Sequence, residues 1–188
     1  MPVAPAAVDV LTALLGVLPR WGPWYLFGAQ AVMAYGVPRL SADVDVTLRL
    51  TPDSPERFVE DMRAAGFDPR VDDPEFVRRT RVLPFVHVAS GMPLDVVLAG
   101  SGLEDEFLAR ARQLDIAGLR VPTIDPEDLM IAKILAGRPK DLGDAGGLWR
   151  ARGREMDAAR IASILRLLEE ALGQSDLTPA FDAIRQRE

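Results

Sequence analysis

The sequence predicts an α+β fold, in which a small mixed sheet flanked by helices is followed by a helical segment. Polar and apolar residues alternate over residues 43–48, as they do in a half-buried strand. Two runs rich in Val and Leu, residues 82–89 and 94–98, are separated by a Ser-Gly-Met-Pro turn and predict a hairpin. After Asp125 the pattern is that of helices alone.

The elements before the hairpin follow from apolar spacing and from glycines. Apolar residues at helical spacing predict a first helix that ends near Pro19. Residues 24–27 form a short apolar strand that turns at Gly28 into a helix over residues 29–35. The next strand carries Asp43 and Asp45 on one side. A further helix is expected over residues 54–65, with a serine as its N-cap.

After the hairpin we expect a helix over residues 104–113 and a small hairpin over residues 114–121, with Gly118 in its turn. Four helices follow, with breaks at Gly or Pro between them: residues 126–136, 139–150, 157–172 and 178–187. The change of pattern near residue 122 is the candidate domain boundary. We therefore expect an α/β core over residues 1–122, with its acids at one edge of the sheet, and a helical subdomain over residues 123–188 that closes a cleft.

The composition excludes several kinds of site. The chain has 188 residues and a net charge of −6, which disfavours non-specific binding to a nucleic-acid backbone. It has no cysteine and a single histidine, His87, so thiolate and His-rich metal centres are excluded. No apolar run suggests a signal peptide or a membrane span, and we expect a cytoplasmic protein without a membrane partner.

Gly28 and three acids are the residues best suited to chemistry. A glycine at a strand-to-helix turn lets backbone N–H groups approach phosphate oxygens. Asp43 and Asp45, two apart on a strand, converge on a divalent metal, and Asp95 supplies a third carboxylate from a neighbouring strand. Such a set predicts two Mg²⁺ ions that clamp the attacking and leaving oxygens of a phosphoryl transfer.

Two stretches resemble a known superfamily. FGAQAVMAYGVPRLSADVDV and VPTIDPEDLMIAKILAGRPKDLGD are similar to the two conserved blocks of DNA polymerase beta-like nucleotidyltransferases, in the spacing of small AbiEii/AbiGii toxin-like enzymes. The resemblance implies a polymerase beta-type core that transfers NMP from a nucleoside triphosphate to a hydroxyl. It implies metal roles for Asp43, Asp45 and Asp95. Nucleotide-binding or catalytic support is implied for Gly28, Ala29, Lys133, Lys140, Asp141 and Asp144.

The resemblance also bears on partners. It implies an acceptor that is tRNA, a protein or a small molecule, and an antitoxin protein if the chain is a toxin. The chain has 22 basic residues, and its only lysines, Lys133 and Lys140, both lie in the second block. This placement indicates that a compact ammonium group is required there. Arg39 is expected either to contact the triphosphate or to pair with an acid as a loop arginine.

Alternatives remain for several residues. Many relatives carry Gly-Gly or Gly-Ser where this chain has Gly28-Ala29, so a catalytically degenerate fold that binds a nucleotide or a protein is the competing hypothesis. Lys133 could instead extend along the margin of the core. The basic run of Arg78, Arg79 and Arg81 is predicted to protect a strand edge. His87 is predicted to be a packed strand residue. The three tryptophans are predicted to lie in the core or at the seam between the two domains.

Overall fold

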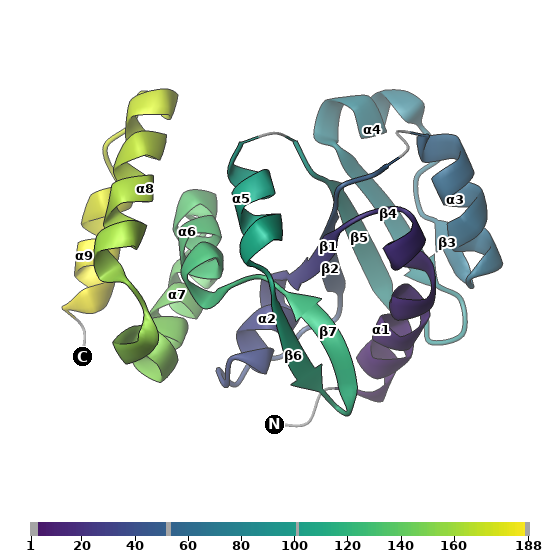
Figure 1. Ribbon diagram of the computed structural model, residues 1–188, viewed down its shortest axis with the longest axis horizontal. Coiled ribbons are helices and arrows are strands. Elements are labelled where there is room, and N and C mark those ends of the chain that lie inside the picture. The colour runs from purple at the N-terminus through teal and green to yellow at the C-terminus, as the bar shows by residue number, and fades with distance from the viewer. Residues whose placement is uncertain (1–3, 52–53, 101, 187–188) are drawn as a thin grey trace. The chain divides into compact units, whose positions relative to one another are not determined.

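The α+β fold predicted from the sequence is confirmed by a computed structural model, which describes residues 4–51, 54–100 and 102–186 (Figure 1). The chain divides into two compact units. The first contains the residues up to Ala31 together with Leu40–Ile124, and the second contains Val32–Arg39 together with the residues from Asp125 onward. Within the described ranges, no helix combines the length and the apolar character needed to cross a bilayer.

The first unit is built on a mixed sheet whose strand order is β3-β4-β5-β2-β1-β7-β6. Its strands are β1 (Trp24–Phe27), β2 (Val44–Leu48), β3 (Phe67–Pro69), β4 (Val82–His87), β5 (Pro93–Leu98), β6 (Arg112–Ile116) and β7 (Leu119–Thr123). The β2–β5 and β1–β7 pairs are parallel, and the other neighbours are antiparallel. The predicted hairpins are therefore confirmed as β4–β5 and β6–β7.

The helices of the first unit are α1 (Pro5–Val17), α3 (Pro55–Ala64), α4 (Pro74–Thr80) and α5 (Leu103–Arg110), with a 3-10 turn at Leu18–Arg20. Helix α2 (Gly28–Ala34) begins in the first unit and ends in the second. The second unit holds α6 (Pro126–Ala136), α7 (Pro139–Arg152), α8 (Ala158–Leu172) and α9 (Leu177–Arg185), with a 3-10 turn at Gly153–Glu155. The predicted end of the last helix at residue 187 lies outside the described residues.

One face of the central strands forms the core of the first unit. Alternate residues of β2 and β5 are buried on this face: Val44, Val46, Leu48, Leu94, Val96 and Leu98. Phe58 of α3 covers it and packs edge to face on Trp21 and on Phe85 of β4, with ring centroids 5.6 and 6.2 Å apart. The opposite face of the same strands carries Asp45 and Asp95, which are half-buried. The period of two thus separates the packed face from the face that carries the acids.

Ser54 is the N-cap of α3, as predicted, although its side chain makes no cap hydrogen bond. Three other predictions about the first unit were wrong in detail. β2 and β5 lie inside the strand order, so the acids are not at an edge of the sheet. Asp43 directly precedes β2. The helix predicted over residues 104–113 ends at Arg110, because Arg112 already pairs with Thr123 of β7.

The basic run was also misplaced. Arg78 and Arg79 lie in the last turn of α4, and Arg81 is its C-cap in the left-handed conformation. Positive side chains at a helix C-terminus interact favourably with the helix dipole. The run therefore lies at the end of a helix, and the prediction that it protects a strand edge was wrong. Asp73 begins this helix by accepting a hydrogen bond from the backbone N–H of Glu75 at 2.9 Å.

Two helices of the second unit, α6 and α8, begin and end at residues of the expected kinds. Asp125 caps α6 and Asp157 caps α8, while Gly137 and Gly173 end these helices at φ of +66° and +67°. Trp149 packs edge to face on Phe181, with centroids 5.5 Å apart. The predicted burial of all three tryptophans is confirmed.

The segment Val32–Arg39 belongs to this helical unit although it lies early in the chain. The Arg152 Nε donates a hydrogen bond to the Tyr35 carbonyl oxygen at 3.3 Å. Val37 lies against Gly147 of α7 so closely that a Cβ on Gly147 would be 2.7 Å from its Cγ1. A β-branched side chain such as valine has little freedom to move away.

We therefore expect Gly147→Ala to be less stable than Gly146→Ala by about 1–3 kcal/mol, the usual cost of overpacking. Both changes gain the same helix propensity, but a Cβ on Gly146 would meet only the end of the Arg150 side chain, at 3.5 Å. Urea unfolding of the two variants measures the difference. Equal stabilities would show that the segment around Val37 moves aside without cost.

Candidate active site

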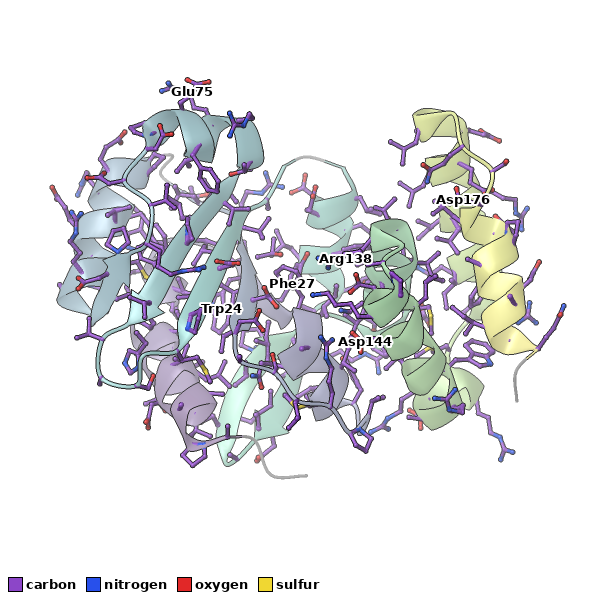
Figure 2. The ribbon with its side chains drawn as sticks, turned by 180° about the vertical axis from the view of Figure 1, so that it is seen from behind. Trp24, Phe27, Glu75, Arg138, Asp144 and Asp176 are labelled. Atoms are coloured by element: carbon purple, nitrogen blue, oxygen red, sulfur yellow. The ribbon has the colours of Figure 1, made fainter. Side chains whose placement is uncertain are left out.

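Gly28 and Asp45 are brought together by strand register. Phe27, labelled in Figure 2, is the last residue of β1. In the strand register it lies opposite Asp45 of the antiparallel neighbour β2. Gly28 follows with φ of +65°, and a Cβ built on it would lie only 2.0 Å from Asp45 Oδ2. The Asp45 carboxylate thus occupies the space that any other residue at position 28 would fill. Ala29, also predicted to contact nucleotide, is buried as the second residue of α2.

Asp45 and Asp95 lie side by side on parallel strands. They are direct register partners in the β2–β5 pair, so their side chains leave the same face of the sheet. Adjacent strands are about 4.8 Å apart, which allows both carboxylates to reach one cation. The structure therefore brings together two of the three predicted metal ligands.

Asp43 is held at the start of β2 by two contacts. The Gln30 Nε2 donates to the backbone oxygen of Asp43 at 3.1 Å, and the Ser41 hydroxyl donates to the Asp43 Oδ1 at 2.7 Å. Gln30 is 3% exposed, in the first turn of α2. Sequence reasoning missed Gln30, although it lies within the glycine-containing motif. It fixes the backbone from which the Asp43 carboxylate extends.

Asp95 has an ion-pair partner that was also missed. The Arg70 Nη2 contacts the Asp95 Oδ1, while the Arg70 Nε donates to the Phe85 carbonyl oxygen at 2.8 Å. Both charged side chains are more than a third exposed. Arg70 directly follows the short strand β3, and 25 residues separate it from Asp95, so no local pattern indicated the pair.

The donor chemistry of these acids fits Mg²⁺, because carboxylate oxygens are the ligands that this ion prefers. In the described part of the chain, however, no group of three or more Asp, Glu or His side chains is already close enough together to hold a metal. Asp95 is engaged by Arg70 and Asp43 by Ser41. The residues suit the ion, and their side chains have other partners in this conformation.

Gly28→Ala is expected to reduce nucleotide binding at least tenfold more than Gly91→Ala does. Both glycines have positive φ, so both variants pay a similar backbone penalty of about 1–2 kcal/mol. A Cβ on Gly91 would meet nothing within 4 Å, whereas one on Gly28 displaces the Asp45 carboxylate. Titration with a fluorescent nucleotide in Mg²⁺ measures the effect. Equal affinities would exclude the Gly28–Asp45 contact from the nucleotide site.

A second cluster of predicted site residues lies in the helical unit. The Lys133 Nζ is 2.8 Å from the Asp141 Oδ1 and 2.8 Å from the Asp144 Oδ2. Arg39 pairs with Asp144, and Arg138 with Asp141. Figure 2 shows Arg138 at the start of α7 and Asp144 further along this helix. The i, i+3 spacing of the two acids on α7 lets both face one lysine of α6.

The cluster is buried and its charges are compensated. The side chains of Asp141, Asp144 and Lys133 are 1%, 9% and 10% exposed. Burial acts to raise the pKa of Asp141, but hydrogen bonds from Arg138 and Lys133 outweigh it and hold that pKa below its ordinary value. Arg39 pairs with Asp144, which agrees with one of the two predictions made for this residue. Lys140 is exposed. The roles of these residues in nucleotide binding stay predictions.

His87 is 8% exposed, at the end of β4, where its ring packs on Phe67 with centroids 5.1 Å apart. Its Nδ1 is 2.8 Å from the Ser90 hydroxyl. The prediction of a packed strand residue is confirmed.

The sequence matches a known protein family. The family described as "Nucleotidyltransferase of unknown function (DUF6036)" matches residues 25–146, which is more than half of the chain and includes both clusters of acids. A search of curated proteins gives no match.

Several solved structures share the fold. The solution structure of the antibiotic-resistance factor ANT(2'')-Ia has a TM-score of 0.59 and 17% identity, covering 89% of this chain and 93% of that chain. Its crystal structure in complex with adenylyl-2''-tobramycin has a TM-score of 0.54 and 16% identity, covering 96% and 95%. A putative nucleotidyltransferase from H. pylori has a TM-score of 0.53 and 13% identity, covering 98% and 97%. At sequence identities this low, the similarity to these structures shows a shared fold and nothing more. The match over residues 25–146 shows that the chain belongs to the DUF6036 family of nucleotidyltransferases.

Proposed function

We propose that the protein transfers NMP from a nucleoside triphosphate to a hydroxyl of an acceptor, with Asp43, Asp45 and Asp95 as the residues that hold Mg²⁺. The observation that carries this proposal is the register of the central strands, which aligns Asp45 with Asp95 and places Gly28 against Asp45. Two carboxylates side by side on one face of a sheet repel each other. A divalent cation with carboxylate oxygen ligands would relieve that repulsion.

In this reaction a bond forms between the acceptor oxygen and the α-phosphorus as the bond to the leaving pyrophosphate breaks, and the hydroxyl proton passes to solvent. Bound Mg²⁺ ions would supply positive charge at the attacking and leaving oxygens. Asp45 and Asp95 would hold these ions from two neighbouring strands. Gln30 fixes the Asp43 backbone, and the missing Cβ of Gly28 leaves room for the Asp45 carboxylate.

We propose a small-molecule hydroxyl as one candidate acceptor. Support comes from the fold shared with ANT(2'')-Ia, whose crystal structure holds adenylyl-2''-tobramycin, and from the coverage of 95% of that chain. The other candidates, tRNA and a protein, rest on the resemblance to AbiEii/AbiGii-like toxins, and an antitoxin partner belongs to that proposal alone. A nucleotide-binding protein without activity, suggested by Gly28-Ala29, is the remaining alternative.

The test is to incubate the purified protein with each labelled nucleoside triphosphate and Mg²⁺, together with bulk tRNA, cell extract or an aminoglycoside. Transfer of label by the wild type, but not by Asp43→Asn and not in excess EDTA, would support the proposal and identify the acceptor class. Tight Mg²⁺-dependent nucleotide binding with no transfer to any acceptor would favour the binding protein instead.

A further inference from the structure

The position of Arg70 is fixed by the edge of the sheet. Its backbone N–H donates to the Pro84 carbonyl oxygen at 2.8 Å, and its Nε donates to the carbonyl oxygen of the next residue, Phe85, at 2.8 Å. Both acceptors belong to β4. Pro84 is the register partner of Asp95, so the guanidinium extends from these two anchors to the Asp95 carboxylate. Arg70 is therefore held in place by the backbone of β4 and is directed at one acid.

Asp95 is also the register partner of Asp45. The guanidinium charge thus lies on the acid-bearing face of the sheet, against one of the carboxylates assigned to the metal. Among the described residues, no three or more Asp, Glu or His side chains lie close enough together to hold a metal in this conformation. The Asp95 carboxylate is instead paired with the Arg70 guanidinium. The positive charge of Arg70 stabilises the ionised Asp95 carboxylate, as a bound divalent cation would do.

The ion pair is also of a kind that can be exchanged. Arg70 and Asp95 have side-chain exposures of 39% and 37%, and ion pairs this exposed add little to stability. The pair therefore contributes little to folding, in contrast to the buried Lys133 cluster. A divalent ion can displace a half-exposed guanidinium without exposing any core residue.

We propose that Arg70 is a positioning residue that holds Asp95 until the divalent metal binds, so that the Arg70–Asp95 pair and metal binding oppose one another. The inference rests on the proposed function, because it takes Asp95 to be a metal ligand. Arg70 would then set the affinity of the site for the metal. It would also set the metal concentration at which the site becomes occupied.

The test is the affinity for Mn²⁺ in the absence of nucleotide, measured by electron paramagnetic resonance of the free ion. Arg70→Gln removes the charge and keeps a side chain able to donate to the Phe85 carbonyl. We expect it to bind Mn²⁺ about tenfold more tightly than the wild type, since a unit charge a few ångströms from a divalent ion changes its affinity by about this factor even in water. The difference should shrink at high salt, which screens the interaction.

Arg81→Gln is the matched control. Arg81 also lies beside β4, and its side chain donates to the carbonyl oxygens of Leu98 at 3.1 Å and Ala99 at 3.0 Å. The variant removes the same charge from the same unit without releasing Asp95, and its Mn²⁺ affinity should equal that of the wild type.

Asp45→Asn separates the two ways in which the inference can fail. If the wild type and Asp45→Asn bind Mn²⁺ equally, the metal site of the proposed function is wrong. If binding depends on Asp45 but Arg70→Gln binds Mn²⁺ with equal or lower affinity, only the role of Arg70 is overturned. Absence of binding in both the wild type and Arg70→Gln also overturns that role.

Discussion

Lys133→Met is expected to lower the free energy of unfolding by about 3 kcal/mol. Removing one partner of a buried ion pair costs roughly 3–5 kcal/mol, because the other charge remains buried without compensation. Here Asp141 keeps Arg138 and Asp144 keeps Arg39, which places the cost at the lower end of that range. Met retains most of the volume of the lysine chain, so little of the loss comes from a cavity. The midpoint of urea denaturation measures the change.

Lys140→Met provides the control. Lys140 is exposed at the start of α7, and substitutions at such positions usually change stability by less than about 0.5 kcal/mol. These two residues are the only lysines of the chain. Comparing the two variants therefore separates the effect of burial on stability from the effect of replacing lysine by methionine. If Lys133→Met were as stable as Lys140→Met, the Lys133 ion pairs would contribute nothing to stability and the cluster would have to be open to water.

Asp45→Asn is expected to reduce transfer on the order of a thousandfold, because several kcal/mol of transition-state stabilisation depend on a correctly held metal. The fold should be unaffected. Asn has the shape of Asp, so it fits the space left by Gly28, and Val44 and Val46 keep their packing on the other face. Rates are measured by release of pyrophosphate, and folding by thermal unfolding.

Asp68→Asn removes the same charge from an exposed position of β3 and should transfer nucleotide at the wild-type rate. An Asp45→Asn variant that keeps its activity would remove Asp45 from the metal site. A variant that unfolds would instead assign the acid a role in stability, contrary to what its half-buried position leads us to expect.

The fold could be predicted where local signals were strong. Helix α6 was predicted with its observed bounds, because Asp125 and Pro126 begin it and Gly137 ends it. The β4–β5 hairpin was found through its apolar runs. β3 and α4 were missed, since a three-residue strand ending in Pro69 has no visible alternation, and its pairing with Phe85 to His87 depends on tertiary contacts.

The site could be predicted only in part for a similar reason. Asp45 and Asp95 stand out because they interrupt apolar strands, and Asp43 directly precedes one of these strands. A parallel register then aligns Asp45 with Asp95. The partners of these acids do not stand out. Arg70 is one of many arginines, and Gln30 reaches Asp43 only after α2 has folded back beside β2. Long-range pairing of this kind leaves no periodic signal in a single sequence.

The placement of Val32–Arg39 in the helical unit governs how the chain can be divided. The polypeptide passes between the two units three times, after Ala31, after Arg39 and after Ile124. A fragment cut at Ile124 would retain Val32–Arg39 but lose the helices on which Val37 and Arg39 pack. The helical unit cannot be excised as one continuous peptide either. Limited proteolysis at the junction after Ile124 would therefore yield two pieces that stay associated through this segment.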